Sequence, residues 1–495
     1  MTDRVLFRGG LLATAIGALG LLLSSCGAWS GSLFDAGRSA APASVTPPWE
    51  GRSTGRVKEF ALHVGRTQWE LAPSKFVQAY AYNGQVPGPE LRVTEGDTVR
   101  VTVTNDLAEP TTIHWHGVEV PAPMDGVPRL SQEPIPPGGS FTYEFIATPA
   151  GTRWYHAHVD ELVQQGDGLV GPLIIEPRRA PDPAPDREYV LVTQEWLGGT
   201  GMGTPPAVPT PSASGGMGGM MGQNGMGGMM GSARPAIDAF TINGKAYPNA
   251  PPLLVHEGER VRLRLINAGA TETQAFALAG HHLSIVSSDG NPLARPVEAE
   301  AVVLGVGERA DVEFVADHPG RWQLRGLLPG QLEHGLAVDV IYAGHESDPV
   351  QGFPQGMRFR PASYADFPGP PHPAAPDRAY ELTLSGGMMG SDEWTINGKS
   401  YPNTDPIEVR PGERVRLKLF NMSMEDHPMH LHGHTFQVVA INGQPVDGPL
   451  KDTLTLHHMD EYDIEFVANN PGTWLFHCHN LVHMGGGLMT EVRYL

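Results

Sequence analysis

Three segments of the chain alternate polar and apolar residues with a period of two: residues 99–104, 261–265 and 415–419. This period places the apolar side chains on one face of an extended strand, so each segment is predicted to form a half-buried β-strand. No long helix-period stretch follows the N-terminal region, and the 61 glycines and 46 prolines supply many turns. The pattern predicts an all-β protein built from many short strands.

The strand-like segments belong to a repeat. Residues 394–403 closely repeat residues 240–249, and each copy is followed by a Gly-Glu-Arg turn and an alternating segment. A weaker third copy begins at Tyr82. Repetition of one unit over 495 residues predicts consecutive β-sandwich domains joined by Pro-rich linkers. We place the three domains at residues 56–178, 186–345 and 357–495.

The N-terminus has the pattern of a targeting signal. Two arginines precede an apolar run at residues 11–23, which is followed by Leu-Ser-Ser-Cys ending at Cys26. This pattern resembles the bacterial lipoprotein signal, in which the cysteine becomes the lipidated first residue. We expect a signal peptide at residues 1–26, a flexible tether at residues 27–55, and an exported cell-envelope lipoprotein, periplasmic or on the outer face of the cell membrane. An ordinary secretory signal or an uncleaved anchor is the alternative.

Net charge and cysteine content narrow the possible partners. A formal charge of -20 argues against a nucleic-acid partner, because phosphate binding needs clustered basic side chains, and it suits small cations. The chain has two cysteines, Cys26 and Cys478. If Cys26 carries lipid, no disulfide can form, and Cys478 is a lone thiol with a histidine on each side.

Ten of the 21 histidines fall in four short motifs. Side chains alternate between the two faces of a strand, so His-X-His directs two imidazoles to one side, and His-Cys-His directs the thiolate opposite to its neighbours. One strand could therefore serve two metal sites. The motifs are His114-Trp-His116, His156-Ala-His158, His427-Pro-Met-His430-Leu-His432 and His477-Cys478-His479-Asn-Leu-Val-His483.

The ligand types indicate copper. Two histidines and one cysteine with a weak fourth ligand are typical of a blue-copper site, and imidazole-only sites also suit copper. Structural zinc would more often use several thiolates. The four motifs together are too regular a pattern for core packing, because each buried imidazole needs a hydrogen-bond partner or a metal.

The middle repeat lacks these ligands. With Gly280 aligned on Gly433, three other residues take the places of the histidines at 427, 430 and 432, namely Gln274, Ala277 and Ala279. We expect the middle domain to act as a spacer. Its adjacent His281 and His282 are expected to be structural or surface residues.

From about residue 75 onward, the four motifs resemble those of the multicopper oxidase family, which includes bacterial laccases and the cuprous oxidases of copper resistance. The resemblance implies three cupredoxin-like Greek-key β-sandwich domains and four copper ions, with a three-copper cluster between the first and third domains. It assigns His427, Cys478 and His483 to the type 1 copper, His114 and His430 to the type 2 copper, His116, His156 and His479 to one type 3 copper, and His158, His432 and His477 to the other.

The resemblance also implies the reaction. A reduced substrate would give electrons at the type 1 copper, and dioxygen would be reduced to water at the cluster. The segment from His477 to His479 would carry the electrons over a short covalent path through Cys478. Asp125, eleven residues after His114, matches the acidic residue that the family places beside the cluster. An Asp-Gly turn is the alternative interpretation of Asp125.

Two positions depart from close relatives. Many bacterial members carry an axial methionine five residues after the last ligand histidine, where this chain has Leu488, with Met489 one position later. An axial Leu488 would leave the type 1 site without a thioether and raise its potential. A shift of register that brings in Met489 stays open. Met484 stands where some relatives have a glutamate, which places more of the proton supply on Asp125.

Methionines suggest the substrate. Residues 215–231 hold six of the 18 methionines, among glycines and no other apolar residue, so this segment cannot form a core. Thioethers favour Cu(I), which predicts a copper-collecting loop, with a disordered linker of biased composition as the alternative. Met424, Glu425 and Asp426 precede His427 and form a possible site for substrate copper, although Met424 could equally serve packing.

We therefore expect a cuprous oxidase that acts in copper tolerance and also oxidises phenols and aromatic amines. A general laccase without a role in copper resistance is the nearest alternative. A copper-sequestering lipoprotein without turnover is a third hypothesis, but storage needs no three-copper site. A copper nitrite reductase would not need the complete set of paired histidines.

Overall fold

The computed structural model describes residues 46–197, 236–354, 357–372, 375–387 and 391–495. The signal peptide with Cys26, most of the tether and the Met-rich segment 215–231 lie outside the described residues. The described residues belong to one compact unit. Within the described part of the chain, none of the helices has the length and apolar character needed to cross a bilayer.

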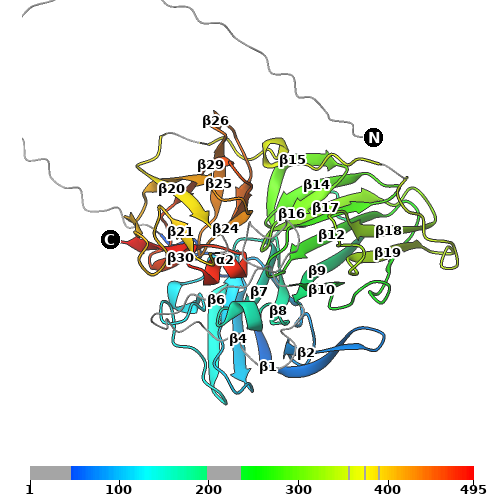
Figure 1. Cartoon of the computed structure of the whole chain (residues 1–495), viewed down its shortest axis with the longest axis horizontal. Coiled ribbons are helices and arrows are strands. Elements are labelled where there is room, and N and C mark those ends of the chain that lie inside the picture. The colour runs from blue at the N-terminus through cyan, green and yellow to red at the C-terminus, as the bar shows by residue number, and fades with distance from the viewer. Residues whose placement is uncertain (1–45, 198–235, 355–356, 373–374, 388–390) are drawn as a thin grey trace, which may run out of the picture. The chain divides into compact units, whose positions relative to one another are not determined.

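Two four-stranded sheets form the first domain, shown in blue and cyan in Figure 1. The 3-10 helix η1 (Ala122–Met124) and the short helix α1 (Glu161–Gln164) lie in the loops between its strands. One sheet has the order β2 (Lys75–Tyr82), β1 (Val57–Ala72), β4 (Thr98–Asn105) and β6 (Ser140–Ile146). The other has the order β3 (Leu91–Thr94), β8 (Val170–Glu176), β7 (Gly151–Ala157) and β5 (Ile113–His116).

The middle domain, green in Figure 1, also has two sheets. The six-stranded sheet has the order β10 (Ile237–Ile242), β9 (Arg187–Leu197), β12 (Arg260–Asn267), β17 (Arg309–Val315), β14 (Leu283–Ser288) and β15 (Asn291–Ala299). The five-stranded sheet has the order β11 (Leu253–Val255), β19 (Ala337–Tyr342), β18 (Arg321–Gly326), β13 (Gln274–Leu278) and β16 (Val302–Leu304). The 3-10 helix η2 (Tyr364–Asp366) follows.

The third domain repeats this arrangement. One sheet has the order β21 (Trp394–Ile396), β20 (Arg378–Gly386), β23 (Arg414–Asn421), β29 (Glu461–Val467), β25 (Phe436–Ile441) and β26 (Gln444–Pro445), with β27 (Leu450–Lys451) also paired to β25. The other has the order β22 (Ile407–Val409), β31 (Met489–Tyr494), β30 (Thr473–Cys478), β24 (His427–Leu431) and β28 (Thr453–Leu456). Helix α2 (Leu481–Gly485) joins β30 to β31. The domain limits proposed from the sequence stay predictions.

The predicted repeat has a physical basis in one Asn-Gly turn per domain. Asn83, Asn243 and Asn397 all have positive φ, at 54°, 50° and 54°, and a glycine with positive φ follows each. Each turn closes an isolated antiparallel bridge just after a strand: Tyr82–Gln85, Ile242–Lys245 and Ile396–Lys399. Each asparagine side chain also hydrogen-bonds two backbone groups of the neighbouring strand, which fixes the turn against the sheet. The alternating segments of the repeat form β4, β12 and β23, as predicted.

The packing brings the first and third domains together. One continuous cluster of buried apolar side chains includes residues of both domains, among them Trp115 and Trp474. The middle domain has a separate core that contains Leu263 and Val312. The histidine-bearing strands β5 and β7 of the first domain and β24 and β30 of the third domain belong to the two domains that share a core.

Candidate metal centre

The structure gathers all ten histidines of the four motifs, together with Cys478 and Asp125, into groups of possible metal ligands. In each group the potential ligand atoms lie within 4.8 Å of one another, and every member is buried. Five of the groups are His427, Cys478 and His483; His116, His156 and His479; His158, His432 and His477; His114, His116 and His430; and His114, Asp125 and His432.

Strand register explains these groups. In the antiparallel pair β24 and β30, His430 lies opposite His477 and Met429 lies opposite Cys478. In the pair β5 and β7, His114 lies opposite His156. Side chains alternate along β30, so Cys478 points away from His477 and from His479, which follows the end of the strand. His477 and His479 join two different histidine groups, and Cys478 belongs to a third group.

The group around Cys478 has three donors that converge. Sγ of Cys478 lies 3.6 Å from Nδ1 of His427 and 3.6 Å from Nδ1 of His483. Asn480 caps helix α2 by accepting hydrogen bonds from the backbone amides of Val482 and His483, which turns the chain so that His483 lies beside Cys478. The indole of Trp394 packs against His483, with ring centroids 3.9 Å apart.

The remaining groups lie between the first and third domains. Nε2 of His432 and Nε2 of His477 are 2.9 Å apart, and Nε2 of His114 and Nε2 of His430 are 3.4 Å apart. Several buried ring nitrogens in these groups make no hydrogen bond, which is costly in a protein interior unless a metal binds them. They are Nδ1 of His116, Nε2 of His156, Nε2 of His158 and both nitrogens of His479.

Burial keeps most of these imidazoles neutral. It lowers the pKa of both His427 and His477 to about 3 and holds the pKa values of His116, His430 and His479 far below their ordinary range. A neutral imidazole has one nitrogen lone pair for a metal. Burial also raises the pKa of the Cys478 thiol above its ordinary range, so only a bound cation would make it a thiolate at neutral pH. Uncharged imidazoles and one thiol fit copper.

Comparison with known proteins identifies the family. Sequence models described as multicopper oxidase match residues 63–180, 219–339 and 373–495. The multicopper oxidase MmcO of Mycobacterium tuberculosis is 34% identical over 99% of this chain and 96% of its own length. The chain belongs to the multicopper oxidase family.

Other relatives of this multicopper oxidase agree. A copper resistance protein A homolog of Pseudomonas syringae is 28% identical over 99% of both chains. The crystal structure of a multi-copper oxidase from Pseudomonas thermotolerans has a TM-score of 0.69 and 30% identity, and the match covers 89% of this chain and 99% of that one. These matches confirm the predicted family, an oxidoreductase, and the all-β fold of three cupredoxin-like domains.

Asp125 of the multicopper oxidase contacts two histidines of the groups. Oδ2 lies 2.9 Å from Nδ1 of His432, and Oδ1 lies 3.2 Å from Nδ1 of His114. Asp125 also begins the Asp-Gly turn that the sequence suggested, because Gly126 has a φ of +84°. A side chain at Gly126 would collide with the carbonyl of Ile113, so this turn packs directly against the strand that carries His114. The two interpretations of Asp125 are therefore compatible.

The two candidate axial residues lie in different surroundings. Leu488 is fully buried in the same apolar cluster as Cys478, and its carbonyl accepts a hydrogen bond from the Cys478 amide at 2.9 Å. Met489 is half-buried and packs against a separate cluster that contains Met484. The second departure from relatives, Met484, therefore packs in the same cluster as Met489.

The surface next to His427 carries exposed methionines. Met424 is 69% exposed, and Met422 and Met459 are 57% and 56% exposed. The Met459 amide donates to the carbonyl of Asn421 at 2.9 Å, which joins the loop before His427 to the loop at residues 457–460. Exposure to this degree excludes a packing role for Met424.

Polar groups of the same two loops complete this surface. Oδ1 of Asp426 lies 2.9 Å from Nδ1 of His457, and Glu425 is partly buried. His427 itself is buried, and its Nε2 is hydrogen-bonded to Oγ of Ser423 at 2.6 Å. The protein thus covers the outer nitrogen of His427.

Sequence reasoning missed several residues around the groups. Met422 and Met459 could have been found as methionines near the motif that begins at His427. Ser423 and Glu161, whose Oε1 lies 2.9 Å from Nδ1 of His158, carry no recognisable motif. Asp452 contacts His116 and also has no sequence signature.

The middle domain has the strand arrangement of the third domain but lacks the ligand histidines. β13 lies between β18 and β16, and β24 occupies the equivalent place between β30 and β28 in the third domain. Nε2 of His281 lies 2.6 Å from the hydroxyl of Tyr342, just as Nε2 of His434 lies 2.6 Å from the hydroxyl of Tyr494. These contacts agree with the structural role expected of His281.

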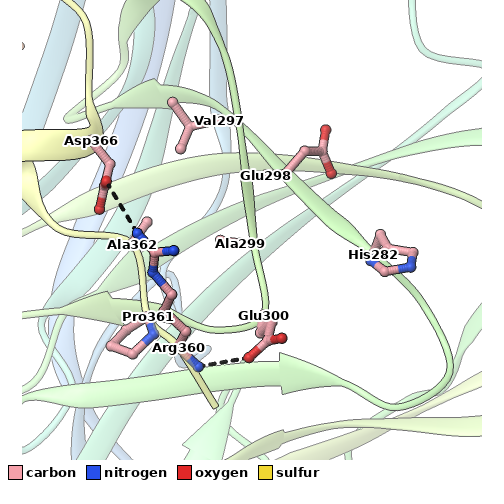
Figure 2. Close-up of a pocket in the computed structure, with 9 residues that line it drawn as sticks. All are labelled: His282, Val297, Glu298, Ala299, Glu300, Arg360, Pro361, Ala362 and Asp366. Carbon is pink, nitrogen blue, oxygen red and sulfur yellow. Dashed lines mark hydrogen bonds and ion pairs between the residues drawn. The ribbon is translucent and has the colours of Figure 1, made fainter.

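The other candidate histidine of the middle domain, His282, lines a cavity of about 280 Å³. Figure 2 shows this cavity between β15 and the segment at residues 360–366, where the Arg360 amide donates to Glu300 at 2.8 Å. None of the ligand candidates lines it. The cavity is therefore separate from the histidine groups.

Proposed function

We propose that this multicopper oxidase oxidises Cu(I) and, more broadly, phenols and aromatic amines, and reduces dioxygen to water. With Cu(I) as the substrate, four Cu(I) ions, one dioxygen and four protons would give four Cu(II) ions and two waters. The observation that carries the proposal is the placement of Cys478: its thiol joins His427 and His483, while the residues on either side join two separate histidine groups.

The residues divide into one electron-accepting site and one oxygen-reducing site. His427, Cys478 and His483 would hold a type 1 copper, and His114 and His430 a type 2 copper. His116, His156 and His479 would hold one type 3 copper, and His158, His432 and His477 the other. The four copper ions would supply one-electron acceptance at the first site and four-electron reduction of dioxygen at the cluster. The covalent segment from His477 through Cys478 to His479 provides a short electron path between the sites.

Protons must reach the cluster from the protein. Asp125 contacts His114 and His432 through its two oxygens and would hold a proton at that place. Met484 cannot carry protons, and it packs among apolar side chains. Asp125 is therefore the acidic residue that we propose for proton delivery.

The exposed methionines favour Cu(I) as the physiological substrate. Thioethers are soft ligands that bind Cu(I), and three of them surround the surface loop before His427. Asp426 and Glu425 add negative charge for a cation. Because Ser423 covers Nε2 of His427, a substrate at this surface would pass its electron through the protein rather than by direct contact. Some relatives are also named copper resistance proteins, which supports a role in copper tolerance.

We further propose that the protein is exported and acts in the cell envelope as a lipoprotein. Cys26 would carry the lipid, residues 27–55 would serve as the tether, and residues 215–231 would collect copper. A copper store without turnover would not need a three-copper site. A general laccase is the remaining rival.

Oxygen uptake by the copper-loaded protein tests the substrate. The variant Met422→Leu/Met424→Leu/Met459→Leu keeps side-chain size and removes the thioethers. We expect its KM for Cu(I) to rise about tenfold or more, which corresponds to a loss of about 1.4 kcal/mol, with turnover of a simple phenol unchanged. Met357→Leu is the matched control, because Met357 is 43% exposed elsewhere on the chain.

Cys478→Ser serves as the inactive control in the same assay. Equal Cu(I) kinetics in the triple variant and the Met357→Leu control would refute the methionine site. Faster uptake with the phenol than with Cu(I), unaffected by deletion of residues 215–231, would show a laccase instead. Loss of Cu(I) turnover on that deletion would support the copper-collecting loop.

A further inference from the structure

A buried carboxylate of the third domain is held by an arginine of the middle domain. Asp452 lies between β27 and β28 and is 1% exposed. Its Oδ1 accepts a hydrogen bond from Nη1 of Arg309 at 2.6 Å, and its Oδ2 accepts one from Nη2 at 2.6 Å. Arg309 begins β17 and is fully buried. A two-pronged bond of this kind fixes both the position and the plane of the carboxylate.

The same carboxylate faces a histidine of the first domain. Oδ1 of Asp452 lies 3.1 Å from Nε2 of His116, and Oγ1 of Thr453 lies 2.9 Å from that nitrogen. A carboxylate that receives two arginine hydrogen bonds can only accept from the imidazole, so Nε2 of His116 carries the proton. Nδ1 of His116 then has the lone pair, and Nδ1 is the nitrogen without a hydrogen-bond partner.

Asp452 reaches a second histidine through its backbone. Its carbonyl accepts a hydrogen bond from Nδ1 of His430 at 2.9 Å, which leaves the lone pair of His430 on Nε2. The rings of His116 and His430 are stacked, with centroids 3.7 Å apart. One residue therefore sets the tautomers of two adjacent histidines that come from different domains.

The charges around Asp452 balance across all three domains. Arg153 of the first domain donates to Oδ2 of Asp452 at 3.3 Å. Nζ of Lys451 lies 3.0 Å from Asp289 and 3.0 Å from Glu308, both of the middle domain. Three buried carboxylates thus face three buried cations. A network of this composition holds together only if every member is paired.

Two glycines allow the close approach of the middle domain. Gly307 has a φ of +86°, and a Cβ there would lie 3.1 Å from the ring of His479 and 3.2 Å from the ring of His116. A Cβ at Gly117 would lie 2.5 Å from Nη2 of Arg309 and 2.6 Å from Oδ2 of Asp452. The middle domain therefore contacts the histidines directly, as well as through the ion pair.

We infer that the ligand-free middle domain is a positioning element of the three-copper site, and that Arg309 acts through Asp452 to present Nδ1 of His116 and Nε2 of His430 to metal. This inference rests on the proposed ligand roles. The sequence led us to expect that the middle domain acts as a spacer, whereas the inference gives it a specific contact with the ligand histidines. Arg309 and Asp452 are positioning residues, because an arginine guanidinium has no lone pair for a metal and both oxygens of Asp452 are engaged by Arg309.

Asp452→Asn tests the inference without changing side-chain size. An amide has one oxygen, so its NH2 group must face either the Arg309 donors or Nε2 of His116. If it faces His116, the imidazole proton moves to Nδ1, the nitrogen needed for metal. We expect copper at the three-copper site to bind about 10–100-fold more weakly, with the blue absorption of the type 1 copper retained. The measurements are chelator competition, copper per chain, and the electron paramagnetic resonance signal of the type 2 copper.

Asp311→Asn is the matched control. Asp311 is also a buried carboxylate between the first and middle domains, bound to Arg264 at 3.2 Å and to Thr152 at 2.5 Å, and it contacts no histidine of the groups. We expect this variant to bind copper as the unmodified protein does. Arg309→Lys keeps the charge and loses the two-pronged bond, so it should weaken cluster copper even where Asp452→Asn fails to fold.

The outcomes separate the inference from the proposed function. Failure of the unmodified protein to bind four copper ions would refute the ligand roles themselves. A fully loaded unmodified protein together with equal copper affinity in Asp452→Asn and Arg309→Lys would refute only the positioning role. Equal copper loss in Asp452→Asn and Asp311→Asn would also refute it, because the cause would then be general destabilisation of the interface.

Discussion

Nδ1 of His427 and Nδ1 of His483 face each other 3.0 Å apart in a buried position. Sγ of Cys478 lies 3.6 Å from each of them, and Leu488 belongs to the apolar cluster that surrounds the thiol. Three donors thus converge in an apolar environment without a nearby carboxylate in the group. Such a set suits a copper ion with three strong ligands and a weak or absent fourth.

Replacement of the thiol should abolish the type 1 copper site and leave copper binding at the histidine groups. In Cys478→Ser we expect the blue absorption to disappear and oxygen uptake to fall to background, because the thiolate ligand and the electron path are both lost. Copper at the histidine groups should remain. Absorption spectroscopy and copper analysis check this, and a variant that keeps its blue colour would contradict the assignment of Cys478.

The axial position can be tested with methionine. Leu488→Met should add a thioether beside Cys478 and lower the type 1 reduction potential, because a stronger axial ligand stabilises Cu(II). A fall of about 59 mV would change a one-electron equilibrium tenfold. Redox titration of the blue absorption measures the shift. Met489→Leu is the control and should leave the potential unchanged; a shift there instead would mean that Met489 is the axial residue.

The Asp125 carboxylate, which contacts His114 and His432, should affect proton delivery to the cluster and not the reduction of the type 1 copper. Asp125→Asn keeps the shape of the side chain and removes the acid, so we expect oxygen turnover to fall by about 100-fold or more. Stopped-flow reduction of the type 1 copper should keep its rate. Asp106→Asn, at an exposed aspartate of the same domain, provides the control. Unchanged turnover in Asp125→Asn would assign the proton supply to another group.

Acid should destabilise the copper-free protein. Unfolded histidines take up a proton near pH 6.5, whereas burial lowers the pKa of His427 and His477 in the folded chain to about 3. Between these values the unfolded state binds more protons, so stability is full above pH 6.5 and declines as the pH falls. Each such histidine contributes up to about 1.4 kcal/mol per pH unit.

Thermal unfolding at several pH values measures this effect. Bound copper competes with protons for the same nitrogens, so the copper-loaded protein should lose less stability over the same range. An acid-independent unfolding temperature of the copper-free protein would show that the histidines are not buried in its native state.

Local patterns made the frame of the protein predictable. The period-two segments became β4, β12 and β23 because alternation reports which face of a strand is buried. The Asn-Gly pairs at 83, 243 and 397 indicate turns for a different reason, since few residues accept a positive φ. Ligand candidates were also readable, because each His-X-His motif lies in a strand or runs across its end.

Contacts between distant segments could not be read from the sequence. Arg309 and Asp452 are 143 positions apart, and Asp452 is 336 positions from His116. Nothing in the local sequence of any of the three residues indicates their contact, which depends on how three domains pack. The choice between Leu488 and Met489 likewise depends on the hydrogen bond between the Cys478 amide and the Leu488 carbonyl, a tertiary contact.

The ligand histidines lie in two segments far apart in the chain, and this separation sets the order in which folding and metal loading can occur. His114 to His158 are synthesised long before His427 to His483, and each three-histidine group needs members of both segments. A growing chain therefore displays four imidazoles of the first domain while their partners do not yet exist. Correct metal loading requires complete translation and domain docking. Until then, the cell has to prevent metal ions from binding to the unpartnered histidines of the first domain.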